Sequence, residues 1–185
     1  MSNSYAQPIL RTPDRAKAMR VVEELLSIAD TGELEVDFEA RISSTQALAP
    51  LIELLPRANW FTDGHGDASS AKEDDPAAHL PIWLQSWAMQ PDIVEPLLQS
   101  AGTSPAAIRW DFQGWPEAPE AGLGPGGCRG AFITLCLNAR DIDLDEPATD
   151  HMVFVHVKQV EAERAPWLAA QVGLRVIGDL VMAPH

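Results

Sequence analysis

Hydrophobic and polar positions alternate strictly along residues 33–42. The even positions are apolar and the odd positions are charged: Leu34, Val36, Phe38, Ala40 and Ile42 alternate with Glu33, Glu35, Asp37, Glu39 and Arg41. A period of two predicts a β-strand with one buried face and one face in water. We therefore expect the apolar side chains to face the core and the acids to face solvent.

Segments with helical spacing of apolar residues precede and follow this strand. Apolar residues recur every three or four positions within residues 12–32, where Thr12 can act as the N-cap. After the strand, Ser43 and Gln46 have the spacing of a capping box, and Pro56 ends the helix that follows. The first third of the chain is thus predicted as helix, strand, helix.

Two further helices are predicted in the middle of the chain. Asp75 suits an N-cap, and the helix after it would carry Trp83 and Trp87 on one face at i,i+4 spacing. We expect those two tryptophans to lie in the core. Residues 91–102 predict the next helix, which ends at a glycine.

The second half of the chain is dominated by predicted strands. Apolar runs or alternating patterns predict strands at 108–112, 131–138, 152–158 and 174–182, with a short helix over 165–171. Consecutive strands favour an antiparallel sheet with the helices on one side.

The predicted fold is α+β, a mostly antiparallel sheet of four to five strands with helices packed on one face. Its length favours a single globular domain over residues 1–185. Two loops, near 59–75 and 113–130, are rich in glycine, proline or acids. The second is long enough to indicate a functional or flexible segment.

Charge narrows the classes of partner. The chain has 27 acidic and 13 basic residues, a formal net charge of -14. Such a charge disfavours nucleic acid and anionic membranes, and favours fast encounter with a basic protein. On the alternating strand, Glu33, Glu35, Asp37 and Glu39 would stand about 7 Å apart on one face, where like charges destabilise the fold unless cations or a partner compensate.

The cellular compartment is inferred from the signals for export and membrane insertion that the sequence lacks. The first residues contain no apolar run of signal-peptide length, and no apolar stretch is long enough to span a bilayer. Cys128 and Cys136 match no metal or redox spacing and are interpreted as free thiols. We therefore expect a cytoplasmic protein.

Two acidic segments are candidate metal sites. Asp63, His65 and Asp67 combine carboxylates and an imidazole between glycines, but a ligand set held by further residues is missing. The segment from Asp141 to Asp145 opens like a calcium loop but lacks its glycine and its final glutamate. A polar connection between strands is the better interpretation, and an acidic patch that meets a partner is the second.

Enzymatic motifs are absent from the sequence. The glycine-rich run 122–130 has no Gly-Lys-Ser/Thr and leads into a strand, which argues against nucleotide binding. No Gly-x-Ser-x-Gly elbow occurs, and His156 is interpreted as a core residue of an apolar strand. We expect no cofactor and favour a protein that is not an enzyme.

The remaining candidate is Trp115, because tryptophans in loops often anchor interfaces. We expect a binding protein whose acidic strand face steers a basic partner, with Trp115 as an adjacent anchor. The concrete form is an inhibitor of the immunity-protein kind that neutralises a basic bacterial toxin or effector. Alternatives are a small metal-dependent hydrolase using Asp63, His65 and Asp67, and a cytoplasmic chaperone or adaptor for a secreted protein. The oligomeric state stays open.

The incomplete ligand set around His65 makes a testable prediction about metals. Calorimetric titration with zinc, manganese and calcium should give no micromolar binding. Micromolar binding that disappears in Asp63→Ala or His65→Ala would contradict this and would favour the hydrolase.

Overall fold

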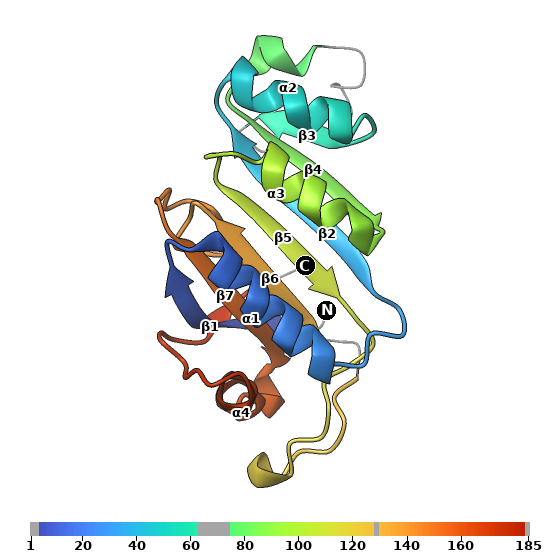
Figure 1. The fold of residues 1–185 in the computed structure, drawn as a ribbon, viewed down its shortest axis with the longest axis vertical. Coiled ribbons are helices and arrows are strands. Elements are labelled where there is room, and N and C mark those ends of the chain that lie inside the picture. The colour runs from blue at the N-terminus through green and yellow to red at the C-terminus, as the bar shows by residue number, and fades with distance from the viewer. Residues whose placement is uncertain (1–3, 63–74, 128–129, 184–185) are drawn as a thin grey trace.

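The chain folds around one antiparallel sheet, seen in a computed structural model that describes residues 4–62, 75–127 and 130–183 (Figure 1). These residues form eight strands in the spatial order β3-β4-β2-β5-β6-β7-β1-β8. The strands are β1 (Ser4–Thr12), β2 (Glu35–Ile42), β3 (Asn59–Thr62), β4 (Ile82–Met89), β5 (Ala106–Asp111), β6 (Phe132–Leu137), β7 (His151–Lys158) and β8 (Val181–Met182).

Four α-helices occur in the described part of the chain, and all four pack on the same side of the sheet. They are α1 (Arg15–Ile28), α2 (Thr45–Leu54), α3 (Val94–Ser100) and α4 (Arg164–Gln171), with 3-10 turns η1 (Pro76–His79), η2 (Pro91–Ile93), η3 (Pro119–Ala121) and η4 (Gln159–Glu161). None of the described helices is long and apolar enough to cross a membrane.

The expected α+β class and antiparallel pairing are confirmed, but the expected count of four to five strands is wrong. The sheet of the described chain has eight strands. β1, β3 and β4 were missed, and the strand expected over 174–182 is reduced to the two residues of β8.

β4 was mistaken for a helix because both of its faces carry large apolar side chains. Ile82 and Leu84 are buried on the helix side, whereas Trp83 and Trp87 lie on the other side, so the alternation is hidden. In a strand, residues four apart also share a face, and the i,i+4 spacing fits both structures. Asp75 does cap the turn after it by accepting a hydrogen bond from the Ala77 amide (3.0 Å), but that turn is the short η1.

β1 was missed because Pro8 interrupts its pattern. The strand pairs with β7 on one side and β8 on the other, and its register shifts between Pro8 and Leu10. Proline has no amide hydrogen for the ladder, and a bulge is where a strand tolerates it. Because Thr12 ends β1, the cap of α1 is Asp14, whose carboxylate accepts from the Lys17 amide (3.0 Å).

The alternation of β2 is largely as expected. Val36, Phe38, Ala40 and Ile42 are buried, Leu34 is partly buried, and Glu35 is exposed. Glu33 lies in the turn before the strand and not in it. Asp37 and Glu39 are partly buried, and Arg109 of β5 and Gln85 of β4 contact them.

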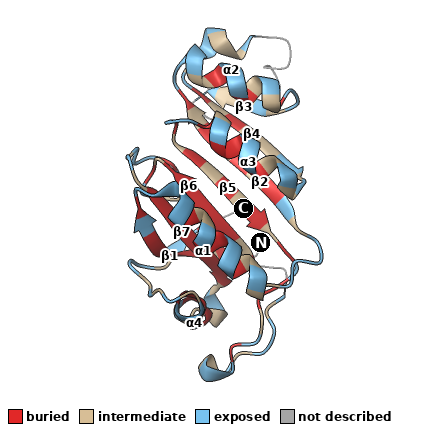
Figure 2. Ribbon diagram, viewed as in Figure 1, coloured by how far each residue is buried: buried red, intermediate tan, exposed pale blue. Residues whose placement is uncertain are grey.

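The main core lies between the helices and one face of the sheet. Figure 2 shows the buried residues along the strands and on the inner sides of the helices, with exposed residues on the outer sides. Apolar side chains from the four helices meet alternate residues of the strands there, such as Phe38, Ile108 and Leu135.

The opposite face, which we call the open face, has a covering at one end in the described part of the chain. There the connection between β6 and β7 folds back, and Leu144 packs with Cys136, Met152 and Phe154 in a second, smaller cluster. The rest of the open face carries polar and aromatic side chains.

The glycine- and proline-rich segment 113–130 folds back on itself as far as it is described. The amide of Gly126 donates to the Trp115 carbonyl (2.9 Å). A β-carbon on Gly114 would lie 2.1 Å from the Gly126 carbonyl oxygen, so this close approach of backbones requires glycine. The described part of this segment is therefore shaped by contacts between its own backbone groups.

Arg164, at the start of α4, holds that segment in place. Its side chain is 1% exposed, and it donates to the carbonyls of Pro116 and Gly124 and to Glu161. A guanidinium satisfies several carbonyls at once because its five donors are fixed in a plane.

We predict that Arg164→Ala lowers the free energy of unfolding by about 3 kcal/mol, since it leaves two carbonyls and one carboxylate without their donor. Urea unfolding measures the loss. The control is Arg140→Ala, whose side chain is 49% exposed and forms a 3.4 Å ion pair with Asp150. That pair should contribute less than about 1 kcal/mol. Equal losses in the two variants would contradict the assigned role of Arg164.

Candidate functional site

The candidate site lies on the open face, where β2 and β5 are paired. Asp37 of β2 lies directly opposite Arg109 of β5 in the sheet, and Glu35 lies opposite Asp111. Because the residues between them are buried in the core, these charged side chains all point to the open face.

Arg109 is a cation that compensates two acids of this face, Asp37 and Asp111. Its Nη2 donates to Asp37 and its Nε donates to Asp111 (2.9 Å), and its guanidinium lies 5.2 Å from the centre of the Phe132 ring. The side chain of Asp37 is 12% exposed and that of Arg109 is 23% exposed. Asp37 is therefore held inside an ion-pair network and is not a freely exposed acid.

The pKa of Asp111 is raised in this network. Burial raises the pKa of Asp111 from 3.8 to about 6; Arg109 opposes this rise, and Asp37 and Glu35 add to it. One arginine thus pairs with two carboxylates, and at Asp111 the effect of burial on the pKa outweighs the opposing effect of Arg109.

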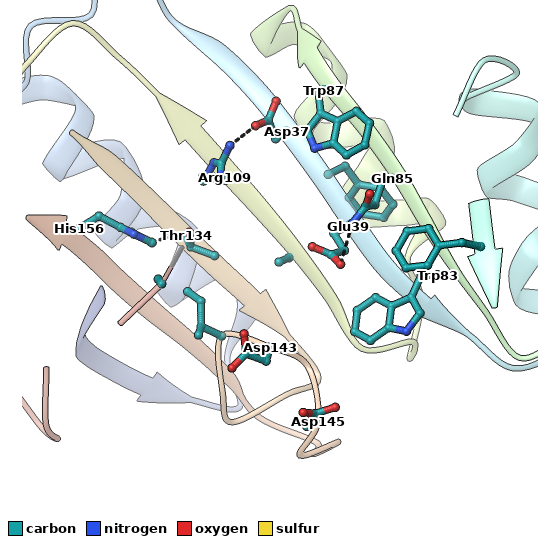
Figure 3. Close-up of a pocket in the computed structure, with 15 residues that line it drawn as sticks. Asp37, Glu39, Trp83, Gln85, Trp87, Arg109, Thr134, Asp143, Asp145 and His156 are labelled. Atoms are coloured by element: carbon teal, nitrogen blue, oxygen red, sulfur yellow. Dashed lines mark hydrogen bonds and ion pairs between the residues drawn. The ribbon is translucent and has the colours of Figure 1, made fainter. Parts of the chain in front are cut away.

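A pocket of about 740 Å³ opens beside this network, and we call it the open-face pocket. Its walls come from β2 to β7 and from the connection after β6, as Figure 3 shows. The side chains important for its chemistry are Glu39, Trp83, Trp87, Arg109, Asp143 and Asp145.

Two carboxylates of the pocket are partly desolvated. Glu39 accepts a hydrogen bond from Gln85 (2.9 Å), and burial raises its pKa, to which Asp143 adds. Asp143 lies at the exposed mouth, and partial burial and the nearby Asp141 and Asp145 raise its pKa. Within the described residues, neither Glu39 nor Asp143 has a basic nitrogen within ion-pair distance.

Aromatic side chains form the wall across from these carboxylates. Trp83 stacks on Phe61, with ring centres 6.3 Å apart. The guanidinium of Arg41 lies 5.6 Å from the centre of the Trp83 ring and contacts Asp145 (3.4 Å). Trp87 is 52% exposed, which is unusual for so large an apolar side chain.

The connection from Asp141 to Glu146 is a polar turn. The carboxylate of Asp141 accepts from the amides of Asp145 (3.0 Å) and Glu146 (2.7 Å). It is thus used for the turn itself, and the turn places Asp143 at the pocket.

His156 is a buried strand residue that borders the pocket. Its Nε2 lies 2.8 Å from the Thr134 hydroxyl and its Nδ1 lies 3.3 Å from the Ser4 hydroxyl. His156 is fully buried, and Phe132 packs edge-on against its ring.

The proposed anchor Trp115 is not at the surface. It is 3% exposed, and its indole nitrogen donates to the carbonyls of His156 (2.8 Å) and Gly130 (3.3 Å). Phe112 packs edge-on against it. Trp115 therefore belongs to the core and presents no exposed face to a partner.

The sequence-based metal candidates Asp63, His65 and Asp67 lie outside the described residues, as does Cys128. Within the described ranges, no group of three or more His, Cys, Asp or Glu side chains could hold a metal ion. Cys136 is buried as a free thiol, and burial raises its pKa.

The structure brings Asp37 and Glu39 to the pocket, leaves Glu35 on the open face beside it, and places Glu33 outside the strand. Sequence reasoning assigned Arg109 no role in a site and placed Asp143 in a polar connection or an acidic patch for a partner. It placed the two tryptophans of β4 on a helix in the core, which is wrong because they lie on the open face of a strand. The alternation of Arg109 and Asp111 with Ile108 and Trp110 was visible in the sequence, but which strand pairs with which was not.

Comparison with protein families, with curated proteins and with solved structures finds no match for this chain. A function therefore has to be inferred from its own residues.

The raised pKa of Asp111 gives a prediction about pH. At the Asp111 carboxyl, the folded protein binds more protons than the unfolded chain between pH 3.8 and about 6, so this carboxyl lowers stability as pH rises through that window. Relative to Asp111→Asn, the wild-type protein should lose stability across that window. Carboxyl ¹³C NMR should find the Asp111 midpoint near 6.

The control for this titration is Asp92→Asn, which removes an exposed acid in η2, away from the open face. Its stability should follow the wild-type pH profile. A titration midpoint of Asp111 near 4, or parallel pH profiles for the wild type and Asp111→Asn, would contradict the assigned desolvation.

Proposed function

We propose that this chain is a non-enzymatic, cytoplasmic binding protein that inhibits a basic bacterial toxin or effector. The observation that carries the proposal is the charge around the open-face pocket. Four carboxylates line it (Asp37, Glu39, Asp143 and Asp145), and Arg109 is the one cation among its lining side chains in the described chain.

The placement of these acids supports a protein partner. They lie on the sheet face that no described α-helix covers, and Glu35 extends the charge beyond the pocket. Each acid there costs the fold some stability through repulsion or desolvation, and a basic surface would offset that cost on binding.

The net charge of -14 acts over longer range. A negative field of this size attracts a basic protein and raises its rate of association, most strongly at low salt. Inhibition is the concrete role because tight binding of an acidic surface can cover a basic active site. This step rests on charge complementarity alone.

The two alternative functions have less support. The hydrolase would use Asp63, His65 and Asp67, which lie outside the described residues. A chaperone or adaptor for a secreted protein would use the same open face, but it would bind an unfolded or apolar segment. The four carboxylates that line the pocket favour a basic partner over that role.

The test begins with capture of partners from the host and purification of the retained protein, which should be basic. We predict that Glu33→Lys combined with Glu35→Lys slows its association by about tenfold at 50 mM salt. The effect should nearly vanish at 500 mM, where screening is stronger. Stopped-flow or surface-plasmon kinetics measure both rates.

The control variant is Glu23→Lys combined with Glu24→Lys, which makes the same change in net charge on exposed positions of α1. It should slow association less, because α1 lies on the other side of the sheet. An acidic partner, or equal effects of the two double variants, would overturn the open face as the binding surface. A basic partner whose activity is not blocked would overturn inhibition and leave binding intact.

A further inference from the structure

We propose that the open-face pocket is the receptor for an arginine side chain of the partner, held between Trp87 and the carboxylates of Glu39 and Asp143. This inference rests on the proposed function and names the group that the pocket recognises. The reasoning starts from how this face already binds two of the chain's own arginines.

Arg41 is the first internal example. Its guanidinium lies over the Trp83 ring, 5.6 Å from the ring centre, and its Nη1 lies 3.4 Å from Asp145. An aromatic face and a carboxylate thus share one guanidinium at the rim of the pocket. Both contacts suit a planar cation.

Arg109 is the second example. It lies over the Phe132 ring at 5.2 Å and donates to Asp37 and Asp111. The same two kinds of group, one aromatic ring and nearby carboxylates, thus hold Arg109 on the open face.

More groups of these two kinds line the same pocket. Trp87 supplies an exposed aromatic face, and Glu39 and Asp143 supply carboxylates that point into the pocket (Figure 3). Within the described residues, no arginine or lysine contacts this set. A volume of about 740 Å³ is ample for the long side chain of an arginine.

Arginine fits this set better than lysine. Its flat guanidinium can stack on Trp87 and donate to a carboxylate at the same time, whereas an ammonium is a compact and strongly hydrated point charge. Gln85 already occupies one oxygen of Glu39, and Asp143, at the mouth, is exposed for pairing.

The experiment uses N-acetyl-arginine amide as the probe and the full chain as the receptor. Titration is followed by ¹H–¹⁵N NMR of the tryptophan indoles. The indole signal of Trp87 should shift saturably. The neutral analogue, N-acetyl-citrulline amide, should bind at least about tenfold more weakly, because it keeps the shape and loses the charge. The lysine analogue should bind more weakly than arginine.

Two variants test the residues. Glu39→Gln combined with Asp143→Asn should weaken binding of the arginine probe by about tenfold, and Trp87→Ala should weaken it by about threefold or more. Both variants should fold, since the first removes partly desolvated charges and the second truncates an exposed side chain; thermal unfolding checks this. The control, Glu23→Gln with Glu24→Gln on α1, removes the same charge elsewhere and should bind as the wild type does.

The outcomes separate this inference from the proposed function. Equal binding of the citrulline probe, equal weakening in the control, or no saturable shift would overturn the arginine pocket. If the basic partner still associates in a manner sensitive to Glu33→Lys/Glu35→Lys, the proposed function stands without it. If the arginine probe binds as expected but the captured partner is acidic, the pocket stands and the proposed function fails.

Discussion

Val36 and Ile108 are buried against the helices, and the period of two in a β-strand then forces Asp37 and Arg109 onto the opposite face. The rest of the structure depends on this constraint. A sheet of eight strands has two large faces, and the described α-helices cover only one of them. The open face therefore has to be stabilised by other means.

Three kinds of contact stabilise the open face, each in a different part of the sheet. At one end, the connection after β6 covers it with Leu144 and its apolar neighbours. In the middle, Arg109 neutralises Asp37 and Asp111 in a partly desolvated network. Beside that network, the aromatic side chains of β4 and the remaining carboxylates surround a pocket. The pocket is thus the part of the face that the chain's own described groups compensate least.

The distribution of charge within the site explains why its acids have different roles. Asp37 has a guanidinium partner and acts mainly in holding β2 to β5. Glu39 and Asp143 have raised pKa values, chiefly because burial penalises their ionised forms. A carboxylate of this second kind gains more from an incoming cation than a solvated one, since part of its hydration has already been lost. The acids of the pocket are for this reason better candidates for recognition than the exposed Glu33 and Glu35, which suit long-range steering.

The sequence by itself determined the local features: the alternation of β2, the apolar strands β6 and β7, the helix over α3, and the excess of acids. Each depends on periodicity or composition within a short segment. Only the tertiary structure decided that Trp83 and Trp87 lie on a strand, since i,i+4 spacing places residues on one face in either element. It also decided that Trp115 is buried and that Arg109 meets Asp37 across 72 positions of sequence. The order of strands brings such distant segments together, and no local pattern encodes that order.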